Sequence, residues 1–279
     1  QEWGQQWNML VFEEDKDGRR LRRQSRAHVN TRHDVINSLP MMDTMRRKMK
    51  QQRVNLVEHV MVTDLVSENG RVIGAIGFGS HNNKIYLFTA KTIVLAAAGS
   101  GLKSIFMGHQ NLTGDLLVAA YESGAALQNM ENAASNTCST LLDIHGLNLY
   151  VGVGGKFINS EGEEFMWQYN PELGNRARLQ DLVLSFCHEA EAGRAPIHLD
   201  MTSASPEDRQ LCRKILPESF NAWDKAGIDP FEQPVEWVPA YYGTITSGGG
   251  ISVDLNGATN IAGLYAAGDI TNEPPHGTY

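Results

Sequence analysis

An apolar strand that runs without interruption into small residues limits the folds open to this chain. Ile93-Val94-Leu95 continues into Ala96-Ala97-Ala98-Gly99-Ser100-Gly101, and small side chains let a backbone approach a flat or phosphorylated ligand closely. Thr113-Gly114-Asp115 then begins an amphipathic helix, which we predict over residues 116–126. Strand, glycine turn and helix follow one another in the order of a nucleotide-binding layer.

A second stretch of the same kind lies further along the sequence. Gly248-Gly249-Gly250 precedes a predicted strand over residues 251–255, and a turn follows at Asn256-Gly257. Gly263-Leu264-Tyr265-Ala266-Ala267-Gly268-Asp269 then repeats the change from apolar to small residues. Either stretch alone has a simpler explanation, because alanine and glycine also permit tight packing and an aspartate after a glycine is often only a cap. The ordered pair is far more specific.

Taken together, the two stretches resemble the flavoprotein subunit family of fumarate reductase and succinate dehydrogenase, which also includes L-aspartate oxidase and adenylylsulfate reductase. The resemblance covers nearly the whole chain in order. It implies an FAD-dependent oxidoreductase with an α+β or α/β fold. Residues 1–130 and 241–279 would belong to a Rossmann-like FAD-binding domain with a β-hairpin extension. Residues 131–240 would form an α+β capping domain, with the substrate held between the domains at the flavin.

The resemblance also implies which residues contact the FAD. The alanine-glycine strand end would lie against the dinucleotide, and Asp269, directly after Gly268, would hydrogen-bond the ribityl chain. The family's Thr-Gly-Asp sequence would approach from the next turn, and a histidine near the expected flavin edge is a further candidate, although loop histidines are often bystanders. The candidates are Ala97, Ala98, Gly99, Gly101, Thr113, Gly114, Asp115, Gly268, Asp269 and His276.

One family feature is missing at the amino end. The family begins with a strand and a Gly-x-Gly-x-x-Gly turn that receives the pyrophosphate, and this sequence contains no such turn. The chain also opens without a methionine and stops within what looks like a binding loop. We therefore expect a fragment of a longer protein, and we expect the fragment alone to bind FAD weakly or not at all.

The two substrate-binding histidines of the family are also missing. Counting from neighbouring motifs, they fall at Asn136 and Tyr242. We therefore expect a small polar substrate other than a simple dicarboxylate.

Candidates for acid–base chemistry come from the same alignment of motifs. Arg178 lies next to Leu179, where the count places the family's proton-donating arginine, and the alternative is a surface or capping charge. Tyr241 and Tyr242 can donate a proton or bind a substrate oxygen, or they are ordinary core or rim aromatics.

Charge and composition restrict the remaining classes. Residues 16–53 hold 12 Lys and Arg against 3 Asp, whereas the whole chain has a net charge of −8. No aromatic platform or helix-turn-helix pattern accompanies this basic segment, so a solvated face or an acidic neighbour is favoured over nucleic acid. No apolar run is long enough to predict a transmembrane segment. The resemblance leaves two expected partners, which are a small-molecule substrate and an electron-transfer partner subunit.

The cysteines indicate a reducing, cytoplasmic compartment. Cys138, Cys187 and Cys212 are odd in number and show no Cys-x-x-Cys spacing, which disfavours a disulfide framework or a zinc ribbon. His28 and His33 have no supporting ligands at suitable spacing, so we predict no metal site.

Two classes of function therefore stay open. The leading hypothesis is part of an FAD-dependent oxidoreductase that passes hydride or electrons between the flavin and its substrate. The alternative is a non-catalytic or degenerate flavin-fold module with a role in assembly. The missing phosphate turn and the missing histidines favour the alternative.

The remaining secondary structure is predicted from periodicity and turn residues. Asn69-Gly70 and His81-Asn82-Asn83 are expected to close hairpins. We predict strands over residues 54–56, 60–66, 72–78, 84–89, 92–97, 151–158 and 196–199, and helices ending near residue 52 and over residues 178–192 and 206–227.

Overall fold

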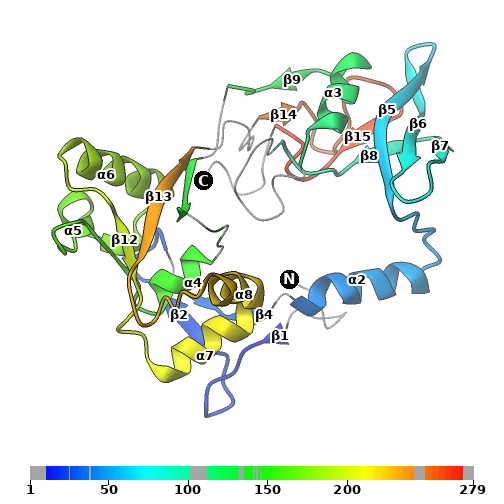
Figure 1. Ribbon diagram of the computed structural model, residues 1–279. Helices are drawn as coiled ribbons and strands as arrows, with labels where there is room; N and C mark the ends of the chain where they lie inside the picture. Colours follow the sequence, from blue (N-terminus) through cyan, green and yellow to red (C-terminus); the bar gives the residue numbers. More distant parts are fainter. Residues whose placement is uncertain are drawn as a thin grey trace. The chain divides into compact units, whose positions relative to one another are not determined.

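The computed structural model places the chain in two compact units, which are described separately (Figure 1). Unit 1 comprises residues 1–56 and 136–240, and unit 2 comprises residues 57–135 and 241–279. The sequence assigns residues 1–56 to the FAD-binding domain, and that domain assignment stays a prediction. The structure describes residues 11–24, 26–37, 39–100, 112–131, 135–140, 142, 144, 146–241 and 249–272.

Unit 1 contains a four-stranded sheet in the order β10-β13-β12-β11. Phe157, Leu199 and Val235 lie directly opposite one another across three antiparallel strands, and all three are buried. Since side chains alternate between the faces of a sheet, this row defines the face that packs on the core. The strands are β10 (Ser135–Ser139), β11 (Lys156–Ile158), β12 (His198–Asp200) and β13 (Val235–Tyr241).

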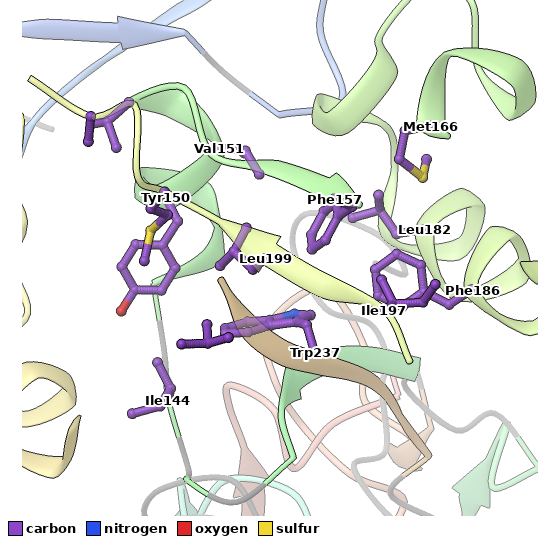
Figure 2. Close-up of a cluster of buried hydrophobic side chains, with 14 of the residues drawn as sticks. Ile144, Tyr150, Val151, Phe157, Met166, Leu182, Phe186, Ile197, Leu199 and Trp237 are labelled. Carbon is purple, nitrogen blue, oxygen red and sulfur yellow. The ribbon is translucent and has the colours of Figure 1, made fainter. Parts of the chain in front are cut away.

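Helices pack with this sheet around an aromatic core. Tyr150 lies 5.7 Å from Trp223 and 6.3 Å from Trp237 between ring centroids. Figure 2 shows Tyr150, Leu199 and Trp237 within this cluster. The helices among the described residues of unit 1 are α2 (Leu39–Gln51), α4 (Leu147–Gly152), α5 (Met166–Tyr169), η2 (Gly174–Arg176), α6 (Leu179–Glu191), α7 (Pro206–Ile215) and α8 (Pro217–Ala226).

The amino-terminal segment joins unit 1 through charged contacts. Arg23 forms an ion pair with Asp208 on α7, and Lys214 of the same helix lies 2.5 Å from a carboxylate oxygen of Glu13. These contacts explain why residues 1–56 group with residues 136–240. Two short antiparallel pairs build the segment: β1 (Val11–Phe12) with β4 (Ile36–Asn37), and β2 (Arg22–Gln24) with β3 (Arg32–Asp34).

Unit 2 begins with an antiparallel sheet in the order β5-β6-β7. Asn69 and Gly70 have φ values of 50° and 75°, which confirms the predicted tight hairpin between β5 and β6. Two further strand pairs and one helix share a core that includes Val72, Leu95 and Leu264. The described part of this unit contains β5 (Val60–Glu68), β6 (Arg71–Gly79), β7 (Ile85–Thr89), β8 (Ile93–Leu95), α3 (Asp115–Glu122), β9 (Leu127–Gln128), β14 (Gly250–Ile251) and β15 (Leu264–Ala266).

Several sequence expectations were wrong at particular elements. Residues 54–56 form no strand, because α2 ends just before them and Arg53 takes a φ of 58°. Much of the strand expected over residues 151–158 is replaced by helix α4 and a turn. The helix expected over residues 206–227 is two helices, since Leu216 takes a φ of −123° before Pro217.

Candidate functional site

The candidate site lies in unit 2, where the two stretches of small residues meet. Strands β8 and β15 pair in parallel, with Ile93 opposite Leu264 and Leu95 opposite Ala266. The backbone N–H of Ala267 continues this pairing by donating to the carbonyl of Leu95 at 2.9 Å. Because parallel strands end at the same edge of a sheet, both small-residue stretches leave that edge side by side. This edge is where α/β folds bind their ligands.

The residues just past the two strands are small and open to solvent. Ala97, Ala267, Gly268 and Asp269 are exposed, whereas Leu95 and Ala266 at the strand ends are buried. Gly268 has a φ of +80°, and a Cβ added to it would meet no atom within 4 Å. The positive φ by itself favours glycine at position 268, and the open space beside it leaves the backbone accessible at the edge of the sheet.

The backbone before α3 approaches the first stretch. A Cβ added to Gly114 would lie 3.1 Å from both Cβ and Oγ of Ser100, so glycine permits this approach. Gly114 has a φ of +78° and caps α3, whose first residue is Asp115. The hydroxyl of Thr113 donates to the Asp115 carboxylate. All three sequence motifs thus meet at one place in unit 2.

Ala98 adds a backbone feature that the sequence analysis did not foresee. Its φ of 58° is in the left-handed region, where a residue with a Cβ is disfavoured by about 1 kcal/mol. Such strained positions cluster where a fold shapes a ligand site. Gly99, which follows, is half-buried.

Other glycines of the second motif do have packing explanations. A Cβ added to Gly249 would lie 2.1 Å from the carbonyl oxygen of Asn129, and one added to Gly250 would lie 2.4 Å from that of Ile270. These glycines allow backbone segments to approach closely, which is the simpler of the two interpretations considered for small residues.

Three predicted site residues, Gly101, Tyr242 and His276, lie outside the described residues. Of Tyr241, only the backbone is described, as the last residue of β13. Arg178 is exposed and occupies the N-cap position of α6 in unit 1.

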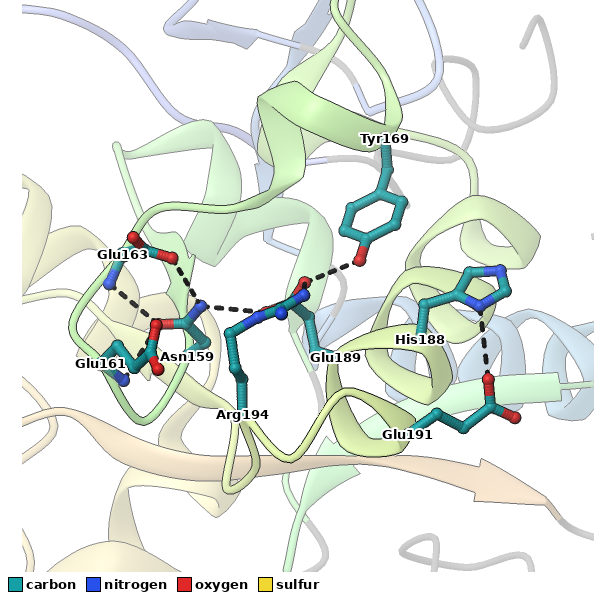
Figure 3. Close-up of polar contacts among 8 residues, drawn as sticks. All are labelled: Asn159, Glu161, Glu163, Tyr169, His188, Glu189, Glu191 and Arg194. Atoms are coloured by element: carbon teal, nitrogen blue, oxygen red, sulfur yellow. Dashed lines mark hydrogen bonds and ion pairs between the residues drawn. The ribbon is translucent and has the colours of Figure 1, made fainter.

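A buried polar cluster in unit 1 was missed by the sequence analysis (Figure 3). Glu189 on α6 is fully buried and receives two hydrogen bonds from Arg194, at 2.8 and 2.7 Å. Tyr169 and Asn159 donate to the same carboxylate at 2.6 and 2.9 Å. These donors, Arg194 above all, lower the pKa of Glu189 to about 2. Its carboxylate is fully used inside the fold, so the cluster has a structural role.

No group of three or more metal-binding side chains occurs within the described ranges. In the part of the chain that the structure describes, no helix combines the length and hydropathy needed to cross a bilayer. Cys138 and Cys212 are buried, Cys187 is half-buried, and none of the three forms a disulfide in the described part of the chain.

Comparison with known proteins defines the class. Residues 2–279 match the FAD-binding domain family, so the chain belongs to that family. This confirms both the resemblance and FAD as the cofactor that the family implies.

Individual relatives agree with this assignment. A fumarate reductase (CoM/CoB) subunit of Methanothermobacter marburgensis is 26% identical over 86% of this chain and 44% of its own length. The L-aspartate oxidase of Bacillus subtilis is 30% identical over 81% of this chain and 41% of its own. A structure of E. coli quinol fumarate reductase has a TM-score of 0.81 at 21% identity, covering 99% of this chain and 50% of that one. The chain thus spans about half the length of the relatives it matches, and it shares their mixed α/β fold.

The described residues fit FAD on structural grounds. The exposed backbone at Gly268 is open on the side that a Cβ would occupy, and the neighbouring Ala97 and Ala267 add little bulk. Asp269 supplies an exposed carboxylate that can accept hydrogen bonds from hydroxyl groups. When bound, FAD supplies hydride or single-electron transfer, which protein side chains alone do not provide.

Proposed function

We propose that the full-length protein carrying this sequence is an FAD-dependent oxidoreductase that acts on a small polar substrate other than a simple dicarboxylate. One observation carries the proposal. The parallel pairing of β8 with β15 brings both small-residue stretches to the same edge, with their small residues exposed. Membership of the FAD-binding domain family supports the cofactor.

The cofactor contacts are proposed from this placement. Ala97, Ala98 and Gly99 would lie against the dinucleotide, and Asp269 after Gly268 would hydrogen-bond the ribityl chain. The Thr113-Gly114-Asp115 turn would approach the cofactor from the start of α3. The contact of Gly114 with Ser100 supports this part. For Gly101 and His276, which lie outside the described residues, we propose the cofactor contacts that the resemblance implies.

The domain roles follow from the same reasoning. We assign residues 1–130 and 241–279 to the Rossmann-like FAD-binding domain, with β5, β6 and β7 as its hairpin extension. Residues 131–240 would form the α+β capping domain. The four-stranded sheet and its helices within unit 1 support a separately folded capping region.

The substrate chemistry is proposed from the positions at which this sequence differs from the family pattern. Arg178 is the candidate proton donor, and Tyr241 and Tyr242 are candidates to bind a substrate oxygen or donate a proton. The exposed position of Arg178 at the N-cap of α6 is compatible both with a proton donor and with the alternative of a surface or capping charge. A test mixes the dithionite-reduced, oxygen-free protein with fumarate and follows the flavin absorbance. We expect no reoxidation, and rapid reoxidation by fumarate would contradict the substrate proposal.

The cellular setting and partner are proposed as well. Three cysteines that form no disulfide among the described residues fit a reducing, cytoplasmic compartment. A relative from Mycobacterium tuberculosis is named a fumarate reductase flavoprotein subunit, and by analogy an electron-transfer partner subunit would exchange electrons with the flavin.

The flavin itself gives the main test. The full-length protein purified from its host should be yellow, absorb in the visible flavin bands and bleach on reduction. Asp269→Ala should lose much of the bound FAD, whereas the control Asp43→Ala, at an exposed site on α2, should retain it. A colourless full-length protein would rule out the enzyme. A yellow protein whose flavin no small polar substrate reduces or reoxidises would favour the non-catalytic assembly module.

A further inference from the structure

The turn that contains Asp269 is closed by a buried threonine. The hydroxyl of Thr271 donates to the carbonyl of Gly268 at 2.8 Å, and its backbone N–H donates to the same oxygen at 3.0 Å. Thr271 is only 5% exposed, whereas Gly268 and Asp269 are exposed. A buried side chain therefore fixes the shape of an exposed turn.

Strands β14 and β9 hold the backbone around Thr271 in place. Its backbone forms a parallel bridge with Ile251 of β14, and the N–H of Asn272 donates to the carbonyl of Ile251 at 3.0 Å. The buried side chain of Asn272 donates to Gln128 of β9 at 2.6 Å. Thr271 thus closes the turn from a rigid position, since two neighbouring strands fix the backbone on its carboxyl side.

We propose that Thr271 is a positioning residue for FAD binding, which holds the Gly268–Thr271 turn so that Asp269 keeps its place at the edge of β8 and β15. This inference rests on the proposed function, in which Asp269 binds the cofactor. The Thr271 side chain acts through its hydroxyl. A free turn would have to be ordered when FAD binds, and a preformed turn avoids that entropic cost.

Two substitutions separate the hydroxyl from simple packing. Thr271→Val keeps the shape and removes the hydroxyl, while Thr271→Ser keeps the hydroxyl and removes a methyl group. Thr271→Val still leaves the Gly268 carbonyl its backbone donor, so the variant should fold. We expect Thr271→Val to raise the FAD dissociation constant roughly three- to tenfold, the usual effect of one hydrogen bond. Thr271→Ser should stay within about twofold of the wild type by the same reasoning.

FAD titrated into the full-length apoprotein and followed by flavin fluorescence measures these constants, and thermal melts confirm folding. In an Asp269→Ala background, Thr271→Val should change the FAD dissociation constant little further, because Thr271 is proposed to act through Asp269. A wild type that binds no FAD would overturn the proposed function itself. If Asp269→Ala weakens binding but Thr271→Val does not, only the role of Thr271 is overturned. If Thr271→Ser binds FAD more weakly than Thr271→Val does, packing alone matters at this position. That result would also overturn the role of Thr271.

Discussion

The backbone N–H of Ala267 donates to the carbonyl of Leu95 at 2.9 Å. This single bond carries the parallel pairing of β8 and β15 one step beyond the last paired residues, to the point where both strands give way to small residues. Two segments that are far apart in the sequence therefore reach one sheet edge in register. The proposed FAD site depends on this relationship more than on any single side chain.

A bulky side chain at the proposed site should block the cofactor. Gly268→Val places its side chain in the open space beside the turn, so the full-length protein should retain far less FAD. Gly162→Val is a matched control, because Gly162 has the same φ of +80° and equally open surroundings in unit 1. Both variants carry the same backbone strain, of about 1 kcal/mol. Flavin absorbance per protein distinguishes them, and equal losses in the two variants would contradict the site.

The close approach at Gly250 should make it intolerant of alanine. A Cβ there would lie 2.4 Å from the carbonyl oxygen of Ile270, so the backbone of β14 and the turn that contains Ile270 would have to move apart. We expect Gly250→Ala to lower the free energy of unfolding by on the order of 3 kcal/mol. Gly70→Ala, at a φ of +75° with nothing nearby, should cost about 1 kcal/mol from strain alone. Urea unfolding followed by circular dichroism compares the two losses in free energy of unfolding. A smaller loss for Gly250→Ala than for Gly70→Ala would contradict this prediction.

The Glu189 cluster should contribute strongly to the stability of unit 1. Glu189→Gln removes the charge that Arg194 pairs with, and we expect a loss of about 3 kcal/mol. Glu191→Gln on the same helix is the control. The side chain of that glutamate is 77% exposed and contacts His188 at the surface, so the loss should stay within about 0.5 kcal/mol. Urea unfolding midpoints measure both variants, and similar midpoints would argue against the buried pair.

The same carboxylate predicts a pH dependence. Because the pKa of Glu189 is lowered to about 2 in the fold from an ordinary value of 4.5, the unfolded chain binds its proton first as the pH falls. The stabilisation is therefore complete above about pH 4.5 and is lost as the pH falls toward about 2. Glu189→Gln should remove this component from the acid limb of a stability profile. If the loss of stability at low pH is the same in the variant and the wild type, groups other than Glu189 cause it.

Local signals in the sequence predicted local structure well. Asn69-Gly70 specifies its hairpin because both residues accept positive φ. The apolar run near residue 150 was predicted as a strand but belongs to helix α4, in which Tyr150 and Val151 are buried. A short apolar run suits a strand or a buried helix equally.

Long-range relationships were beyond the periodicity of the sequence. The motifs suggested that the stretches near residues 99 and 268 meet, but only the structure gives the register of β8 with β15. The attachment of residues 1–56 to unit 1 depends on ion pairs such as Arg23 with Asp208, whose partners are distant in sequence. The Glu189 cluster also went unnoticed, since its members are ordinary surface residue types until the fold buries them.

Hydrogen exchange on the full-length protein, with and without FAD, tests the central claim most directly. Amides of residues 96–100 and of residues 267–271 should both become protected when FAD is added, and those of residues 189–194 in unit 1 should not respond. Protection of only one of the two segments, or of neither, would contradict a shared binding edge.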